Sequence, residues 1–439
     1  MIQFSAREVV SQSGIQDAIK KHWDFNIYNK ELKSKEVRCD DILNIWKDNL
    51  LLQCEKFSKK IKLEFDNFKF LYNNVKDKNS YKAALISEIF RNKYITKNCA
   101  NLDLHTLQNL LVLQIENKKI KFTIAWGHSK RNCGKLKTEN YFADFAELYS
   151  ISILFLIGKV ANLLSGLPIE ITILSGGLRF YNALFANLNE IEKYDEQRNK
   201  IAKFLCDDHV SIKFEKCKLD KMDLDKIDEI SQNISEHSAK NKFNTILCNI
   251  DWKNIFTNDL YPHNIKIPKI IREISNIDIL IAGSIASILN KKAKEYFENI
   301  LNIETLNQCI EVMKAITQIS TKKYLAIHIL NKNIFSLKDY IRLSVHSKPD
   351  RNDIPAIYTL GVNGGNKLSQ HNIMVIKKNS KIDFITNYEA KLFDYTKVIN
   401  ANNSCLFDWC DNNALFFIKN TDCNIANLIK SIKFINLNQ

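Results

Sequence analysis

"KIKFTIAWG", residues 119–127, and "PIEITILSGG", residues 168–177, are the two segments that decide the fold predicted from this sequence. The first alternates as a β-strand does, and the second has the composition of a strand that ends in a double glycine. Between them, apolar residues recur at helical spacing from Phe142 to Leu163. A strand, a helix and a second strand in this order indicate an α/β fold with a largely parallel sheet and flanking helices.

The segments before and after this unit extend the pattern. Apolar residues follow helical spacing in residues 41–51 and 102–115, which predicts a helical N-terminal region. Residues 209–215 alternate again as a strand. Residues 276–284 are compatible with either a strand or a buried helix, because periodicity alone does not separate the two.

The chain becomes rich in short strands after about residue 331, and "KNSK", residues 378–381, is a hairpin signal between two of them. The strand-rich part is expected to complete the functional site. We therefore predict three regions, which are a helical N-terminal region at 1–118, an α/β Rossmann-like core at 119–330 and a strand-rich C-terminal region at 331–439.

Length and composition exclude several classes of protein. The chain has 439 residues, 45% of them hydrophobic, so it can bury a large core. Only 11 glycines and 5 prolines are present, which disfavours a turn-rich all-β sandwich. The net charge of +14 favours anionic partners. The lysines are scattered, with no basic tail or arginine-rich block, so a nucleic-acid-binding protein is the less favoured interpretation.

Cysteine spacing and hydropathy bear on cofactors and location. The 11 cysteines include no C-x-x-C pair, and Cys405 and Cys410 are not followed by a second pair, so zinc-site spacing is absent. The N-terminus lacks the apolar run of a signal peptide, and the most apolar stretch, residues 150–167, is interrupted by Lys159. We expect a cytoplasmic protein with reduced thiols, no metal, no other cofactor and no membrane partner.

The loop after the first strand is the first candidate site. In an open α/β sheet, ligands bind beyond the carboxyl ends of the strands, and amide groups at a helix start favour anions. Lys130 and Arg131 add charge there, although a solvent-facing basic loop would have the same composition. Asp144 and Glu147 share a face at the start of the next helix, either as ordinary compensation of the helix dipole or as acid/base groups.

Two further segments carry candidate residues. Ser175 ends the second strand before a glycine pair that lacks the G-x-G-x-x-G pattern, so a dinucleotide site is not supported. "YIRLSVHS", residues 340–347, places Arg342, Ser344 and His346 on one face of a strand. A solvated edge strand would explain the arginine and the serine without a function. His371 opens a later strand and could meet this face in space.

The ordered set of these motifs, over about residues 119–400, resembles the isonitrile (isocyanide) synthase family, also called the pyoverdine/dityrosine biosynthesis family. "SKRN", residues 129–132, looks like a variant of the family's Lys-Ser-x-Asn loop, and Asp144 and Glu147 match its acidic pair. "RLSVH", residues 342–346, matches its R-L-S-x-H strand, and His371 matches its W-H strand, with Gln370 in place of the usual tryptophan.

One motif departs from the family. After the second strand its members read S-D-G-x-x-F-x-D, whereas this chain has Gly176 and Asn182 at the two acidic positions. The change indicates a divergent member whose substrate or reaction differs, if those carboxylates bind the amine or move protons. The N-terminal hundred residues match no part of the family pattern.

The resemblance implies a transferase/lyase of secondary metabolism that converts an amino-acid amine into an isonitrile, with ribulose-5-phosphate as carbon donor. Lys130 and Arg131 would hold phosphate, Arg342 a carboxylate or phosphate, and His346 or His371 would exchange protons together with Asp144 and Glu147. The remaining substrate-binding residues that it implies are Asn132, Ser175 and Ser344.

The implied partners are an amino acid and a sugar phosphate, with no nucleic acid, and a homo-oligomer is compatible with this interpretation. One alternative is a related sugar-phosphate-dependent enzyme with a different amine acceptor or product. Another is a non-catalytic binding protein derived from the family, in which Gly176 and Asn182 mark the loss of activity.

Overall fold

The computed structural model describes most of the predicted elements. The described residues are 30–68, 77–127, 130, 138–175, 188–216, 226, 229–230, 337, 339–345, 352–358, 369, 372–377, 381–385, 387–401, 406–410, 413–419 and 424–435. Their helices and strands are β1 (Ser34–Val37), α4 (Cys39–Phe68), α5 (Lys78–Arg91), η2 (Cys99–Asn101), α6 (Leu104–Glu116), β2 (Ile120–Trp126), α7 (Phe145–Ser165), β3 (Ile169–Ser175), α9 (Leu188–Leu205), β4 (Val210–Lys216), β5 (Ile341–Leu343), β6 (Ile373–Ile376), β7 (Ile382–Ile385), α16 (Asn387–Leu392), β8 (Thr396–Asn400), η5 (Asp408–Cys410), β9 (Ala414–Ile418) and α17 (Ile425–Lys430).

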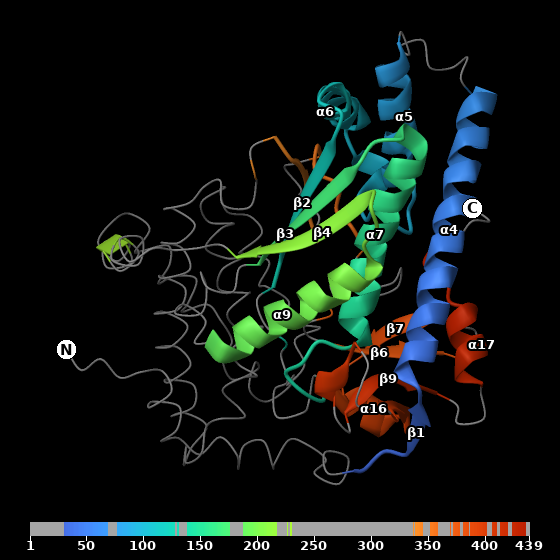
Figure 1. Ribbon diagram of the computed structural model, residues 1–439, viewed down its shortest axis with the longest axis vertical. Coiled ribbons are helices and arrows are strands. Elements are labelled where there is room, and N and C mark those ends of the chain that lie inside the picture. The colour runs from blue at the N-terminus through green and yellow to red at the C-terminus, as the bar shows by residue number, and fades with distance from the viewer. Residues whose placement is uncertain are drawn as a thin grey trace, which may run out of the picture.

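A four-stranded parallel sheet has the order β4-β3-β2-β5, and its strands β2, β3 and β4 lie in the upper half of Figure 1. Phe122 of β2 lies opposite Ile171 of β3 on one side and Ile341 of β5 on the other. The segments predicted as a strand, a helix and a second strand are β2, α7 and β3. The α/β prediction, with its parallel sheet and flanking helices, is confirmed.

One face of this sheet is covered by helices because its alternate residues are apolar. Ile120, Phe122 and Ile124 of β2 are fully buried on that face. Helix α7 approaches the same face closely at Gly158, where an added Cβ would lie 2.9 Å from Val210 Cγ1 and 3.2 Å from Ile171 Cδ1. Helix α9 packs beside α7 and against β4. A side chain at position 158 would therefore force the helix away from the sheet.

Helix α7 lies in the core of the described part of the protein and contacts both sheets. Almost every side chain along it is buried, which is typical of a helix that is apolar on all sides. Among the described residues it is the one helix that is long and apolar enough to cross a membrane, yet 89% of its most apolar window is buried inside the protein. It ends at Gly166, whose φ of 71° is readily adopted by glycine.

A second, mixed sheet has the order β1-β8-β9-β6-β7. The predicted hairpin is confirmed, because β6 and β7 pair antiparallel with Ile376 opposite Ile382. Strand β1, from the N-terminal part of the chain, pairs in parallel with β8, so that Ser34 lies opposite Lys397. In the same way β5 reaches back from the C-terminal part to the parallel sheet. The proposed domain boundaries stay a prediction.

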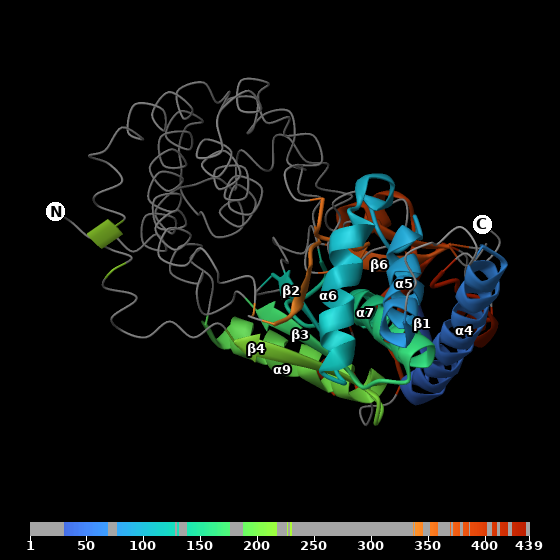
Figure 2. The ribbon, with the colours of Figure 1, turned by 90° about the horizontal axis from the view of Figure 1, so that it is seen from above.

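The predicted helical N-terminal region is confirmed by α4, α5 and α6. Figure 2 shows α4 and α5 beside α7 and α6 beside α5, and α4 also packs against α17. Trp46 anchors α4, because its buried indole N–H donates to Ser152 Oγ of α7 at 2.9 Å. Its ring also meets Phe145, Tyr149 and Phe434 edge to face.

The strand predicted at 340–347 is shorter than expected in its described part. Strand β5 ends at Leu343, and Ser344 forms only an isolated bridge with Ala356. In the described residues 352–358, Ala356 and Ile357 form only isolated bridges, with Ser344 and Thr96. Pro355 has no N–H to donate to a strand partner, although its carbonyl accepts from the Ser344 amide at 2.9 Å. Residues 276–284 lie outside the described residues.

Candidate functional site

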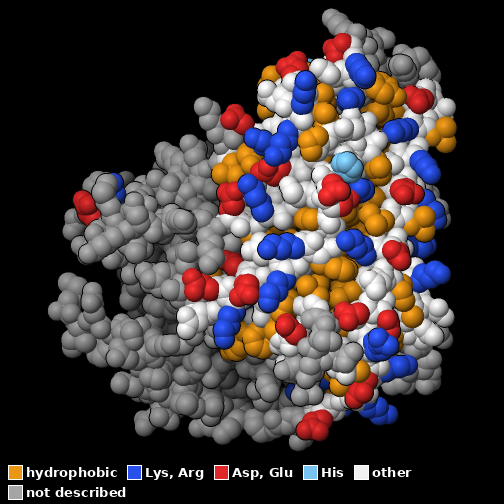
Figure 3. Space-filling model, in the orientation of Figure 1, with side chains coloured by type: hydrophobic (Ala, Val, Ile, Leu, Met, Phe, Trp, Pro, Cys, Tyr) orange, Lys and Arg blue, Asp and Glu red, His pale blue; other side chains and the backbone are white. Residues whose placement is uncertain are grey.

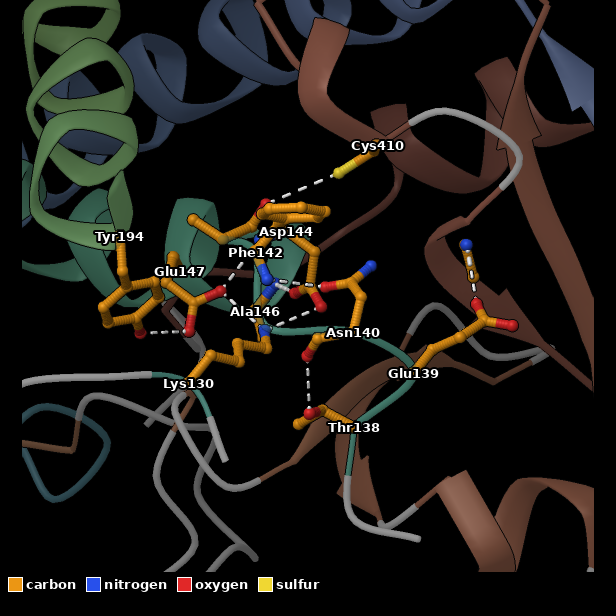
Figure 4. Close-up of polar contacts among 12 residues, drawn as sticks. Lys130, Thr138, Glu139, Asn140, Phe142, Asp144, Ala146, Glu147, Tyr194 and Cys410 are labelled. Atoms are coloured by element: carbon orange, nitrogen blue, oxygen red, sulfur yellow. Dashed lines mark hydrogen bonds and ion pairs between the residues drawn. The ribbon is translucent and has the colours of Figure 1, made fainter. Parts of the chain in front are cut away.

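Three charged side chains meet beyond the carboxyl end of β2, where the chain enters α7 (Figure 4). Lys130 Nζ lies 2.7 Å from Asp144 Oδ2 and 2.7 Å from Glu147 Oε2. The side chains of Lys130 and Glu147 are 0% exposed and that of Asp144 is 6% exposed. The structure therefore brings together Lys130, Asp144 and Glu147, which we call the buried triad.

The local sequence explains why the two carboxylates lie at this place. Asp144 caps α7 and accepts a hydrogen bond from the Ala146 amide at 2.7 Å. Glu147, three residues later, accepts one from the Asp144 amide at 2.8 Å. The Asp144 side chain also accepts from the Glu147 amide, so Asp144 and Glu147 form a reciprocal capping box, which satisfies amide groups that the helix itself leaves unpaired. Asp144 and Glu147 therefore stabilise the start of the helix, as ordinary compensation of the helix dipole would. They also have a second contact, which is the ion pair of each with the buried Lys130.

Burial sets the protonation of the triad. Desolvation raises the pKa of Asp144 to about 7, and the nearby Glu147 adds to the rise, while Lys130 opposes it. Burial also disfavours the charge on Lys130, but the two carboxylates outweigh it and raise the pKa of Lys130. One cation faces two carboxyls, so the triad would carry a net charge of −1 if all three groups were ionised. Asp144 is therefore suited to exchange a proton near neutral pH.

A second buried cluster lies at the carboxyl end of β3. Ser175 Oγ donates to the Asp195 carboxylate, at 2.9 Å from Oδ1 and 3.1 Å from Oδ2. Arg198 Nη2 donates to Ser175 Oγ at 3.2 Å and also to Asp195 Oδ1. Arg198 Nη1 donates to the Gly127 carbonyl, just past the end of β2, at 2.8 Å. Helix α9 thus ties the ends of β2 and β3 together.

Tyr194, also on α9, joins the two clusters. Its hydroxyl donates to Glu147 Oε1 at 2.7 Å. The Arg198 guanidinium carbon lies 4.3 Å from the centroid of the Tyr194 ring and 4.7 Å from that of Phe214. The described part of the chain therefore holds a continuous set of buried polar groups where the parallel sheet ends, which is where α/β proteins bind ligands.

Strand β5, which contains Arg342 and is followed by Ser344, lies in the same sheet, with Arg342 on the other face. Arg342 lies opposite Thr123 of β2, whereas Ile341 and Leu343 are buried on the face that α7 covers. Ser175 contacts α9, so it lies on the face of Ile341 and Leu343. Arg342 is half-buried and Ser344 is buried. The expected contribution of Arg342 and Ser344 to the functional site stays a prediction.

Other residues named from the sequence lie outside the described residues. These are Arg131, Asn132, Gly176, Asn182, His346 and His371. Their predicted roles are unchanged by the structure. In the part of the chain that it describes, no group of three or more His, Cys, Asp or Glu side chains could hold a metal ion.

Sequence reasoning missed Tyr194, Asp195 and Arg198. They stand in a segment, "EIEKYDEQRNK", whose many charges are typical of a solvated helix. A signal was present, because Tyr194 and Arg198 are four residues apart and fall on the same side of a helix as Ile191. That side faces the core, and Tyr194 is 1% and Arg198 0% exposed.

The fold and these clusters define an α/β protein with a buried ionisable site at the carboxyl ends of its parallel strands. No family model and no curated protein matches the sequence. Among solved structures, the chain is similar to the PvcA protein of Pseudomonas aeruginosa, with 12% sequence identity and a TM-score of 0.48. The alignment covers 76% of this chain and 99% of that one. A similarity at this level leaves the activity to be argued from the site.

Proposed function

We propose that the protein is an isonitrile synthase-like enzyme that acts on an amino-acid amine and takes its carbon from ribulose-5-phosphate. The observation that carries the proposal is the buried triad, with Asp144 at a pKa of about 7 beyond the carboxyl end of β2. The ordered motifs of the sequence supply the reaction class. The identity of the amine is left to experiment because Gly176 and Asn182 replace the family's acids.

The first chemical step sets the requirement that the triad meets. An amine attacks a ketone only as the neutral base, so a proton must leave the ammonium group. A carboxylate with a pKa near the working pH can take that proton and later return it. In the proposal Asp144 does this, while Lys130 keeps its charge and holds both carboxylates in place. His346 and His371 are proposed as the acid/base groups of later carbon–carbon cleavage.

Phosphate binding is proposed for the loop after β2. Lys130 and Arg131 were both predicted to hold phosphate. Because Lys130 Nζ already contacts two carboxylates at 2.7 Å, we assign the direct contact to Arg131 and leave Lys130 to the triad. Arg131→Ala should then weaken ribulose-5-phosphate binding by about tenfold or more, since a charge-assisted hydrogen bond contributes about 1.5–3 kcal/mol. Calorimetry on the folded variant measures this, and unchanged affinity would contradict the assignment.

The deciding experiment measures whether a carbon atom of ribulose-5-phosphate is transferred to the amine nitrogen. The purified protein is incubated with ¹³C-labelled ribulose-5-phosphate and a pool of amino acids, and products are analysed by mass spectrometry. A product that carries one labelled carbon on the amine nitrogen supports the proposal, and Asp144→Asn should reduce its formation by about 10²–10⁴-fold. Consumption of the sugar phosphate into another product would support the alternative enzyme, and tight binding without turnover the non-catalytic protein. The absence of both binding and product in the folded wild-type protein would refute all three.

We also propose that the positive charge of the chain serves anionic metabolites. On the face in Figure 3, basic and acidic side chains of the described residues are intermixed. A nucleic-acid surface would instead concentrate one sign of charge. Binding to duplex DNA or RNA, measured by fluorescence anisotropy, should be weak and lost as salt is raised. Tight, sequence-dependent binding at physiological salt would overturn this part of the proposal.

A further inference from the structure

We infer that Lys97 is a nucleophile that joins the carbonyl carbon of a substrate as an imine. In the proposed function this carbonyl is the ketone of ribulose-5-phosphate, so the identity of the substrate rests on that proposal. The assignment of the amine rests on the contacts and the burial of Lys97. The sequence alone did not single out this residue, because the N-terminal hundred residues match no part of the family pattern.

Backbone contacts fix Lys97 beside the carboxyl end of β5. The Lys97 amide donates to the Ala356 carbonyl at 2.7 Å. On the other side of that segment, the Ile357 amide donates at 2.7 Å to the carbonyl of Ser344, the residue that follows β5. Asn98 strengthens the contact, because its Oδ1 accepts from the Ala356 amide at 2.9 Å. Lys97 is therefore held at the carboxyl edge of the parallel sheet, where α/β proteins bind ligands.

The side chain of Lys97 reaches back to the end of β5. Its Nζ donates at 2.9 Å to the carbonyl of Val345, two residues beyond the end of the strand. The same Nζ lies 5.3 Å from the centroid of the Tyr358 ring. Val345 itself packs against the core, so the carbonyl that receives the amine is held in place. The amine therefore lies beside the segment that contains Arg342 and Ser344, which are proposed as substrate-binding residues.

Burial sets the reactivity of this amine. Lys97 is half-buried, and desolvation lowers its pKa. The pKa is raised instead for Lys130, Lys213 and Lys377, each of which pairs with at least one carboxylate. The contacts of Lys97 with a carbonyl and an aromatic ring offset less of the effect of burial than a carboxylate does. A lowered pKa leaves more of the amine neutral, and a desolvated lysine of this kind is a nucleophile for carbonyl compounds.

The reaction exchanges a carbonyl oxygen for the amine nitrogen. The neutral Nζ attacks the carbonyl carbon, the oxygen leaves as water with the two protons of the amine, and a C=N bond replaces the C=O bond. Once protonated, the imine carbon is a better electrophile than the ketone carbon. The amino-acid amine then adds to it and forms its own C=N bond, while Lys97 leaves with its two protons restored. The lysine is thus regenerated, as covalent catalysis requires.

Reduction with borohydride tests the inference, because it converts an imine into a stable secondary amine. The purified protein is incubated with ¹³C-labelled ribulose-5-phosphate without an amino acid, then reduced, digested and mapped by mass spectrometry. We expect the labelled adduct on Lys97. Lys97→Arg keeps the positive charge, but its guanidinium stays protonated, so the adduct should be lost. A wild-type protein that binds ribulose-5-phosphate in calorimetry and forms no adduct on Lys97 would overturn the inference.

Lys93→Arg is the matched control. Lys93 lies four residues earlier, is exposed, and has its Nζ 5.6 Å from the centroid of the Tyr94 ring. The variant therefore removes a lysine with the same kind of ring contact and should leave the adduct on Lys97. Circular dichroism checks that each variant is folded, and the mapping of the wild-type protein needs no variant.

A measurement without the sugar phosphate separates this inference from the proposed function. Brief treatment with formaldehyde and cyanoborohydride at pH 7 methylates amines at a rate that rises with their neutral fraction, and one digest compares Lys97 with Lys93. Faster methylation of Lys97 supports the inference even if ribulose-5-phosphate does not bind, and slower methylation would overturn it. Isonitrile formation at the wild-type rate by folded Lys97→Arg would also overturn it, and would leave the proposed function standing.

Discussion

Replacing Lys130 by methionine tests the view that the buried triad depends on its single cation. Methionine keeps an unbranched apolar stem and removes only the charged end, so packing changes little. The ammonium group contacts two carboxylates at 2.7 Å and its side chain is 0% exposed. Removing one partner from a buried ion pair lowers the free energy of unfolding by about 3–5 kcal/mol. That is a large part of the 5–15 kcal/mol or so typical of a folded protein.

The loss of unfolding free energy in Lys130→Met should be larger at high pH than at low pH. Without Lys130, the negative charge of the two buried carboxylates can be neutralised only by protonation. A carboxyl whose folded pKa is raised contributes most stability at low pH, and that stability is lost as the pH rises through the folded value. In the wild-type protein that value is about 7 for Asp144. The variant should therefore differ from the wild type less at pH 5 than at pH 8.

Urea unfolding followed by tryptophan fluorescence at pH 5 and pH 8 measures both effects. Lys200→Met is the matched control, because Lys200 pairs with Glu196 at 3.3 Å on the surface, where the two side chains are 48% and 66% exposed. An exposed pair of this kind contributes less than about 1 kcal/mol. A Lys130→Met protein as stable as the wild type at pH 8 would refute the reasoning. So would an equal loss at both pH values.

Three further predictions follow from described contacts. Asp144→Asn keeps the cap of α7 but should remove the decline in stability that Asp144 causes between about pH 3.8 and pH 7; an unchanged slope in urea midpoints would contradict this. Gly158→Val should lower stability by about 1–3 kcal/mol in thermal unfolding, since a Cβ there lies 2.9 Å from Val210 Cγ1. Val345→Asp should destabilise far more than Val345→Ala, because Val345 packs against the core; equal melting temperatures would show otherwise.

The parts of the fold that could be predicted are those with a local pattern. In β2 the apolar residues alternate, and in α7 they recur at helical spacing, because each segment buries one set of its own side chains. The positions of β2, α7 and β3 could therefore be predicted from the sequence. The segment that became β1, "SKEV", is short and half-exposed. It is a strand because β8 lies beside it, and no local pattern in the sequence records that pairing.

In the site, too, the residues with a local pattern could be predicted and the others could not. Asp144 and Glu147 could be placed at a helix start because the capping pattern is local. That Lys130 is buried between them could not be predicted, since its neighbours in the sequence, such as Arg131 and Lys135, indicate a solvated loop. Tyr194 becomes part of the site only because α9 packs beside α7.

The pairing of β1 with β8 has a consequence for how the protein is made. The Cys39 amide, next to β1, donates to Asn400 Oδ1 at 3.2 Å, and 361 residues separate the two. A ribosome adds about 5–20 residues per second, so the nascent β1 waits roughly 20–70 s before its partner strand exists. Throughout that time β1, the first strand in the described part of the chain, lacks its partner, and an unpaired strand is a site for wrong pairing. The charged residues Lys35 and Glu36 within it are of the type that discourages such pairing until β8 leaves the ribosome.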